Sequence, residues 1–128
     1  MELLPDAHAF IWFMDGDNSL PEKAIVAIKD IKNRCFISVA SLWEIAIKLS
    51  LKKIELKSGF NKINDFLANN DIDILPITFD HLQKLVTLPF HHRDPFDRII
   101  ISQGLAENFR IVTKDKELEN YTERILWR

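Results

Sequence analysis

The chain is predicted to be an α/β protein with three layers: a central parallel β-sheet flanked by helices on both faces. Short apolar runs that are typical of buried strands alternate with longer segments whose apolar residues recur every three or four positions. Turn-forming residues separate these segments, and the chain has no internal repeat, linker or low-complexity tract. Strands that alternate with helices favour a parallel sheet, because each helix returns the chain to the same end of the sheet.

The first half of the chain contains two predicted strands and four predicted helices. Pro5 is expected to end the first strand, because proline donates no ladder hydrogen bond. Ser19 and Glu22 have the spacing of a capping box, so a helix is predicted to start there and to carry Ile31 at the end of its apolar stripe. The predicted strands are residues 2–4 and 35–37, and the predicted helices are residues 9–14, 22–31, 38–52 and 60–67.

The second half continues the alternation. Thr78 is predicted to cap a helix that follows a strand. Asp94 followed by Pro95 is a strong start signal for the next helix, whose run of isoleucines indicates deep burial. The predicted strands are residues 72–77, 110–113 and 124–127, and an irregular loop rich in histidine covers residues 89–93.

Four acidic residues stand where apolar runs give way to helical patterns. The carboxyl ends of parallel strands meet at one edge of a sheet, where such folds keep their ligand sites, so these side chains are expected to share a pocket. Crowded carboxylates repel each other unless a cation neutralises them. The sequence therefore predicts a site for Mg²⁺ or Mn²⁺, which prefer oxygen ligands. The four acids are Asp6, Glu44, Asp97 and Asp115.

Each of these acids also has a structural explanation, because carboxylates favour the positive end of a helix and accept hydrogen bonds from its first N–H groups. Asp6 and Asp115 can each cap the helix that follows them. Ser41 and Glu44 have the spacing of a capping box. A carboxylate can cap a helix and bind a metal at once, so both interpretations stay open.

Two features of the later helices refine the choice of ligands. Asp94 and Asp97 lie three residues apart and face the same side, so Asp97 is predicted to be the ligand and Asp94 the cap that supports it. Glu44 lies among apolar neighbours, where a charge needs a partner, and Lys48 stands one turn later to supply one.

Other polar residues near the acids have weaker assignments. Ser41 and Thr113 are expected to orient a carboxylate or a water molecule, although capping explains the serine as well. His91 and His92 have no metal-ligand spacing, so a loop role or contact with a phosphate is predicted for them.

Composition indicates one ordinary globular domain over residues 1–128. Hydrophobic residues make up 47% of the chain and charged residues 28%. The formal net charge of −2 gives no global attraction for nucleic acid, so any such binding needs a local basic patch. The single cysteine, Cys35, lies in an apolar run and suits a reducing cytoplasm. No apolar run approaches the length of a membrane span, and no membrane association is expected.

Four motifs resemble those of the PIN-domain family, and specifically of its VapC-like toxins. They occur in the family's order and at fitting spacings along almost the whole chain. Small departures are Ala7, where a hydroxyl residue is usual, Pro5 in place of an apolar residue, and Gly104 in place of an alanine. The motifs are LPDAHA at residues 4–9, SVASLWEIAIK at 38–48, HHRDPFDR at 91–98 and VTKD at 112–115.

The resemblance implies a PIN-like three-layer fold and a metal-dependent ribonuclease whose four acids bind one or two divalent ions. It also implies a small antitoxin as a partner, docked near the lysine-rich helices and able to place an arginine against the acids, and a homodimer. Five basic residues are expected to help bind RNA: Lys48, Lys52, Arg93, Arg98 and Lys114. A solvated helix face is the alternative explanation for the lysines.

Two rival functions are open from the sequence. A receiver-like phosphoacceptor domain has a similar length and an acidic Mg²⁺ pocket, but it normally has paired acids after its first strand, and Asp6 has none beside it. A degenerate PIN-like module that only binds a partner is the second rival. Retention of all four acids disfavours it, whereas Ala7 keeps it open.

Overall fold

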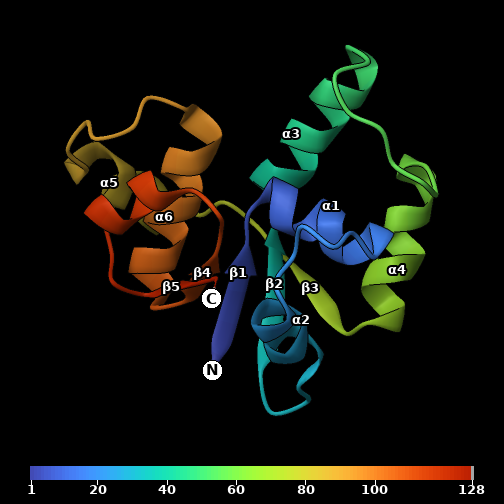
Figure 1. Cartoon of the computed structure of the whole chain (residues 1–128). Helices are drawn as coiled ribbons and strands as arrows, with labels where there is room; N and C mark the ends of the chain where they lie inside the picture. Colours follow the sequence, from blue (N-terminus) through green and yellow to red (C-terminus); the bar gives the residue numbers. More distant parts are fainter. Residues whose placement is uncertain (128) are drawn as a thin grey trace.

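The computed structural model describes residues 1–127 and has the predicted three-layer α/β architecture (Figure 1). Five strands of the described chain form one sheet in the order β3-β2-β1-β4-β5, and every pair of neighbours runs parallel. The strands are β1 (Glu2–Pro5), β2 (Arg34–Ser38), β3 (Ile72–Leu75), β4 (Arg110–Val112) and β5 (Ile125–Leu126). The helices are α1 (Ala7–Asp15), α2 (Glu22–Lys29), α3 (Val39–Ser50), α4 (Ile63–Asn69), α5 (Phe79–Thr87) and α6 (Pro95–Glu107), with 3₁₀ turns η1 (Phe60–Lys62) and η2 (Lys116–Asn120).

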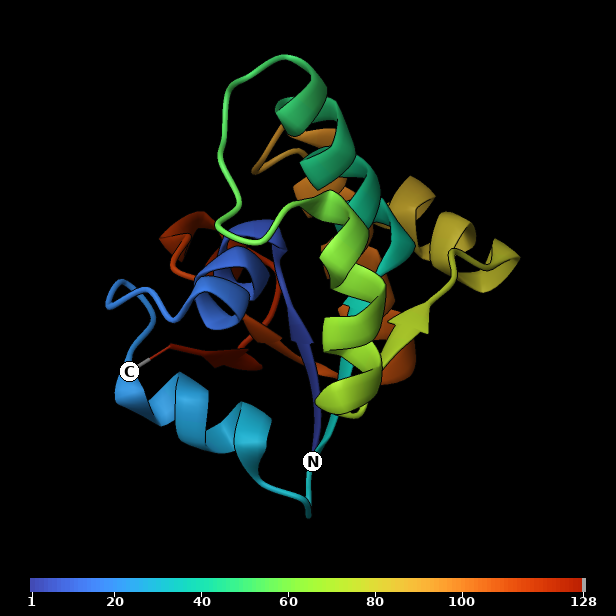
Figure 2. The same cartoon turned by 90° about the vertical axis from the view of Figure 1, so that its right-hand side faces the viewer.

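Two hydrophobic cores lie on opposite faces of the sheet. Successive side chains of a strand point to opposite faces, so neighbouring residues enter different cores. Leu3 and Val112 belong to the core beneath α1, α2 and α4, whereas Leu4 and Ile111 belong to the core beneath α5 and α6. Figures 1 and 2 show α5 and α6 on one side of the sheet and α1 and α4 on the other. This alternation explains why the strands are almost wholly apolar in sequence.

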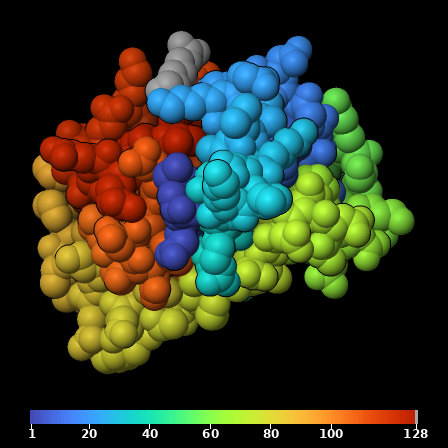
Figure 3. Space-filling view, turned by 90° about the horizontal axis from the view of Figure 1, so that it is seen from below, coloured from blue at the N-terminus to red at the C-terminus, as the bar shows by residue number. Residues whose placement is uncertain are grey.

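The carboxyl ends of the strands meet at one edge of the sheet. Asp6 follows β1, and its backbone N–H donates to the carbonyl of Val112 at 3.0 Å, so the end of β1 is held beside the end of β4. Ser38 ends β2 at the same edge. Figure 3 views the opposite edge, where the first residues of the chain lie between the start of β2 and the segment that leads into β4.

Two details of the predicted helix after Ser19 are wrong. The N-cap of α2 is Pro21, and no side chain caps this helix. The backbone N–H of Ser19 instead donates to Asp17, at 2.8 Å, in the preceding turn. The helix ends at Lys29, and Ile31 is 97% exposed, so it is not part of the apolar stripe.

The start of α3 also differs from the predicted capping box. Ser38 is the N-cap, and its Oγ accepts a hydrogen bond from the N–H of Ala40 at 3.1 Å. Ser41 and Glu44 therefore lie inside the helix, and capping does not explain either of them. Pro5 is accommodated in β1 because it lies beyond the last residue of β1 that is in register with β2.

Gly104 has a packing reason that the sequence did not indicate. A Cβ atom at this position of α6 would lie 2.9 Å from Cδ1 of Ile111 in β4. The glycine allows the helix to approach the sheet closely, which offsets the weakening of the helix expected from its low propensity. Across residues 1–127, none of the helices combines the length and apolar character that crossing a bilayer requires.

Candidate metal-binding site

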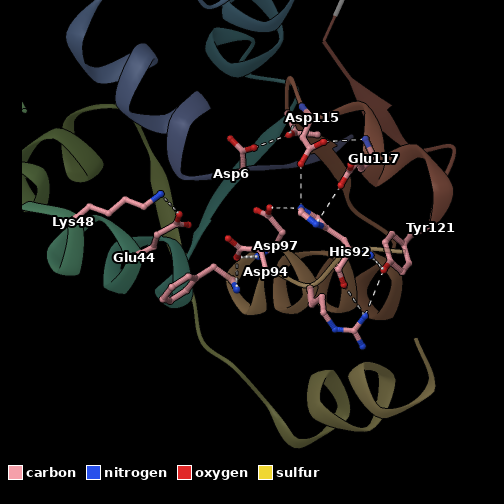
Figure 4. A network of polar contacts seen from close by, with 12 residues as sticks. Asp6, Glu44, Lys48, His92, Asp94, Asp97, Asp115, Glu117 and Tyr121 are labelled. Carbon is pink, nitrogen blue, oxygen red and sulfur yellow. Dashed lines mark hydrogen bonds and ion pairs between the residues drawn. The ribbon is translucent and has the colours of Figure 1, made fainter. Parts of the chain in front are cut away.

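A cavity of about 380 Å³ opens at the carboxyl edge of the sheet, and all four predicted acids line it. They come from the end of β1, from α3, from α6 and from the segment after β4, so residues far apart in the sequence converge as predicted (Figure 4). Asp94 also lines the cavity. The full lining is Asp6, His8, Trp12, Glu44, Lys48, Asp94, Asp97, Lys114 and Asp115.

Thr113 joins two of these acids. Its hydroxyl donates to Oδ2 of Asp6 at 2.6 Å and accepts the N–H of Asp115 at 3.1 Å. The other oxygen of Asp6 accepts the N–H of Ala9, at 2.9 Å, and caps α1. Burial raises the pKa of Asp6, although the hydrogen bonds from Thr113 and Ala9 oppose this effect. Asp6 and Asp115 are thus both helix caps and neighbours in the cavity.

Asp97 lies in the first turn of α6 beside its N-cap. Oδ1 of Asp94 accepts the N–H groups of Phe96 and Asp97, at 2.8 and 3.1 Å, which confirms Asp94 as the cap. Burial, followed by the charge of Asp94, raises the pKa of Asp97 to about 6, while a hydrogen bond from His92 lowers it. A carboxylate in such surroundings is stabilised by any cation that reaches it.

Glu44 forms the opposite wall of the cavity. It is 5% exposed, and Nζ of Lys48 donates to its Oε2 at 2.7 Å, as the spacing of the two residues predicted. The charge of Glu44 also contributes, as the smallest cause, to the raised pKa of Asp6.

His92 belongs to this cluster, whereas the sequence predicted for it only a loop role or contact with a phosphate. Its Nε2 lies 2.8 Å from Asp97 and 3.2 Å from Asp115, and its Nδ1 lies 3.3 Å from Glu117. Burial lowers the pKa of His92, but the hydrogen bond and charges of its acidic partners outweigh this and raise it. The only sequence signal was its position five residues before Asp97; the proximity of Asp115 depends on the fold.

The loop that carries His92 is tied down by two side chains. The hydroxyl of Tyr121 accepts the backbone N–H of His92 at 2.7 Å and donates to the carbonyl of Pro89 at 2.9 Å. The guanidinium of Arg98 donates to the carbonyls of Pro89 and His92, at 3.0 and 3.4 Å. These bonds fix the position of His92 relative to α6.

The predicted supporting and RNA-binding residues lie in different surroundings, and only some of them line the cavity. Ser41 is fully buried, and its hydroxyl finds no partner within the described part of the chain, so it does not orient a carboxylate here. Arg98 is 7% exposed and holds loop carbonyls, so its predicted contact with RNA is replaced by a structural role. Lys48 and Lys114 line the cavity, whereas Lys52 and Arg93 are exposed outside it.

The donor set of the cavity fits a divalent cation that prefers oxygen. Five carboxylates and two lysines line the cavity, which leaves an excess of negative charge, and Asp6 and Asp97 have raised pKa values that a cation would reverse. At the cavity's edge, ligand atoms of His92, Asp115 and Glu117 all lie within 4.8 Å of one another. Oxygen ligands of this kind suit Mg²⁺ and Mn²⁺.

The fold and the site together define a parallel α/β protein with an acidic cavity at the carboxyl edge of its sheet. The sequence profile of the PIN domain matches residues 3–124. The chain therefore belongs to the PIN domain family, as its motifs indicated. A search of curated protein sequences found no match to it.

Three solved structures share this fold over nearly their whole lengths. VapBC2 from Rickettsia felis, bound to a DNA fragment from its promoter, is similar with a TM-score of 0.71 and 17% identity, covering 100% of both chains. A toxin–antitoxin complex from Klebsiella pneumoniae has a TM-score of 0.62 and 16% identity over 97% of this chain and 95% of that one. FitAcB from Neisseria gonorrhoeae has a TM-score of 0.60 and 13% identity, over 98% and 96%.

Proposed function

We propose that the protein is a metal-dependent ribonuclease that hydrolyses RNA phosphodiester bonds and acts as the toxin of a toxin–antitoxin pair. The observation that carries the proposal is the convergence of Asp6, Glu44, Asp97 and Asp115 around one cavity. Membership of the PIN domain family supports a nuclease activity, and the similar toxin–antitoxin structures support the biological role.

In this proposal Asp6, Glu44, Asp97 and Asp115 would together hold Mg²⁺ or Mn²⁺. The bound cation supplies Lewis-acid chemistry, which lowers the pKa of water and neutralises charge that develops on the phosphate. Thr113 keeps Asp6 and Asp115 oriented toward the same point. Lys114 at the rim attracts the RNA backbone, since cations that contact phosphate dominate affinity for nucleic acids.

The proposal includes two protein partners. A small antitoxin would inhibit by placing an arginine against the carboxylates, because the guanidinium pairs well with them. A homodimer would cover the apolar surface that α5 and the following loop leave exposed, where Phe79, Val86 and Phe90 are 73%, 86% and 81% exposed.

The buried, reduced thiol of Cys35 is consistent with action in the cytoplasm.

The activity is tested with purified protein, Mg²⁺ or Mn²⁺, and a panel of single-stranded and structured RNAs. The informative variant is Asp6→Asn, because asparagine caps a helix as well as aspartate does and so removes the charge while α1 stays capped. We expect cleavage by the unsubstituted protein that chelation abolishes and that Asp6→Asn reduces at least about a hundredfold. Intact RNA with either metal would overturn the proposal.

The same experiment separates the rival functions. A degenerate PIN-like module would bind a partner and leave every RNA intact, although all four acids line the cavity. A receiver-like phosphoacceptor would take up phosphate on a carboxylate, but the match to the PIN domain over residues 3–124 gives that alternative no support.

A further inference from the structure

A second and larger cavity, of about 740 Å³, adjoins the acidic one. Lys114 and Asp115 line both cavities, so the two spaces meet at the segment that follows β4. The larger cavity lies between this segment, η2 and β5, and its volume is within the range of about 300–1,000 Å³ that is common for ligand pockets. The ribonuclease proposal makes no use of it.

Trp127 brings an aromatic ring to this second cavity at the active edge of the sheet. Val112 of β4 is in register with Leu126 of β5, so the next residues along the two parallel strands, Thr113 and Trp127, stand at the same level. Both line the second cavity, and Thr113 also holds Asp6. The tryptophan is therefore placed one strand away from the residue that orients the acids.

A series of aromatic side chains connects the two cavities. The rings of Trp127 and Trp12 are 5.9 Å apart, and those of Trp12 and His8 are 5.8 Å apart. Trp12 and His8 line the acidic cavity. Both tryptophans are partly buried. Proteins that bind single-stranded nucleic acid use such rings as stacking platforms for successive bases.

Side chains of both charges line the second cavity, and each kind suits a different part of a nucleotide. Lys114 and Lys116 offer cations for phosphate groups, and Lys114 stands where the two cavities meet. Glu119 and Glu123 are carboxylates, which repel phosphate but accept hydrogen bonds from the amino groups of bases. The lysines therefore suit the backbone, and the glutamates suit a base edge.

We propose that the cavity lined by Trp127 binds one base of single-stranded RNA, adjacent to the phosphodiester bond that water hydrolyses at the acidic cavity. The base stacks on Trp127, and the phosphate that joins it to the scissile position lies at Lys114. The proposal rests on the ribonuclease function and adds to it a base-binding site at Trp127, which a base can enter only when it is not stacked in a duplex.

The test measures binding of fluorescein-labelled RNA hexamers by the full chain carrying Asp6→Asn, with Mg²⁺ present, so that binding is followed without cleavage. In this background we expect Trp127→Leu to weaken binding about tenfold, the scale of one lost base–aromatic stack, and Trp127→Phe to retain most of it. Phe60→Leu is the matched control, because Phe60 is an exposed aromatic residue of η1 that lines neither cavity.

RNA with a single abasic position distinguishes stacking from a general effect on the fold. When the abasic position is the one that enters the cavity, the protein that keeps Trp127 should bind the RNA about tenfold more weakly. Trp127→Leu should then cause no further loss of affinity for that RNA. A 2-aminopurine at that position should be quenched on binding, which requires no substitution of Trp127. The proposal would be overturned if Trp127→Leu bound RNA as tightly as the form that keeps Trp127, or if Trp127→Leu caused the same loss of affinity with every abasic RNA. It would also be overturned if 2-aminopurine were quenched at no position.

These outcomes are distinct from a failure of the ribonuclease proposal. If the unsubstituted protein cuts no RNA but binding depends on Trp127 and on one base, the catalytic proposal fails and the base site stands. If the protein cuts RNA and Trp127→Leu binds like Phe60→Leu, the base site fails and the nuclease stands.

Discussion

His81 and His92 both pair with carboxylates, yet they occupy very different surroundings. His81 is fully buried between α5 and α6, where its Nε2 lies 3.0 Å from Glu107 and its Nδ1 accepts the N–H of Thr78 at 3.0 Å. His92 lies on a loop beside the acidic cavity, within 3.3 Å of three different carboxylates. One histidine completes a helix cap, and the other faces a cluster of negative charge.

The difference shows that a histidine–carboxylate contact does not by itself indicate a functional site. The pair of His81 and Glu107 has one acid, and the bond that Nδ1 accepts keeps a proton on Nε2, which suits a neutral structural imidazole. At His92 several acids share a space that ligands can enter, and the pKa of Asp97 rises to about 6. Converging charges beside an open cavity are the stronger indication of chemistry.

The largest expected effect is on RNA cleavage, when the carboxylate beside His92 loses its charge and the carboxylate beside His81 loses its charge as the control. Asp97→Asn should reduce RNA cleavage at least about a hundredfold, since a direct carboxylate ligand to the cation is lost. Glu107→Gln, the matched change beside His81, should leave cleavage within about twofold, because surface changes away from the site have small effects. Initial rates with Mn²⁺ at equal protein concentration measure both. A comparable loss of cleavage rate in the two variants would mean that the carboxylate beside His92 is no more important for activity than the one beside His81.

The sequence predicted the elements and the four acids because those features depend on local pattern. Alternating strands and helices required a parallel sheet, and a parallel sheet required that residues such as Asp6 and Asp115 share an edge. The error at the start of α3 arose because Ser38 and Ser41 both have good capping chemistry, and only the end of β2 decides between them.

The remaining parts of the site depend on contacts between distant segments. His92 meets Asp115 because its loop is bound by Arg98 and by Tyr121, which lies twenty-nine residues later, and nothing near His92 or Tyr121 in the sequence specifies the bond between them. Arg98 was assigned to RNA because it lies beside Asp97, yet its side chain turns inward to loop carbonyls. Burial of a long basic side chain is set by tertiary packing.

The second prediction concerns stability, to which His81 should contribute more than His92. His81→Ala should lower the free energy of unfolding by about 2–3 kcal/mol, because it opens a buried space and removes the reciprocal cap with Thr78. His92→Ala should lower it by less than about 1 kcal/mol, since the imidazole is near the surface and relieves repulsion among acids. Urea denaturation of the metal-free variants measures both. The comparison fails if His92→Ala is the more damaging change.

The third prediction concerns pH. Asp97 has a folded pKa of about 6, above its unfolded value, so its contribution to stability is complete below about pH 4 and is lost as pH rises through 6. His92 has a raised pKa, so its contribution is present below about pH 6.5 and is lost as pH rises through the folded value. The two groups act in the same direction, and burial of Asp6 adds to them.

Metal-free protein should therefore lose about 1–2 kcal/mol of stability between about pH 5 and pH 8. Saturating Mn²⁺ should remove most of this loss, since a cation that binds the folded state replaces the proton and the imidazolium. His81 provides the contrast: in His81→Ala the same pH dependence should persist, whereas in Asp97→Asn it should shrink. Thermal melting at several pH values, with and without Mn²⁺, is the measurement. A stability that rises toward pH 8 without metal would contradict the assignment.

The smallest expected effect tests whether the position of His92 matters as well as its presence. Tyr121→Phe removes the hydroxyl that accepts the N–H of His92 and donates to Pro89, while the ring that packs against His91 remains. Because the loop keeps its bonds to Arg98, we expect a loss of only about 1 kcal/mol in stability. Cleavage should fall about threefold to tenfold, because small displacements of groups at a reacting centre are costly.

Thr87→Val, which removes a hydroxyl bonded within α5 on the His81 side, is the control and should leave the rate unchanged. Equal rates for Tyr121→Phe and the unsubstituted protein would mean that the cavity tolerates a mobile His92, and the contrast between the two histidines would then rest on charge alone.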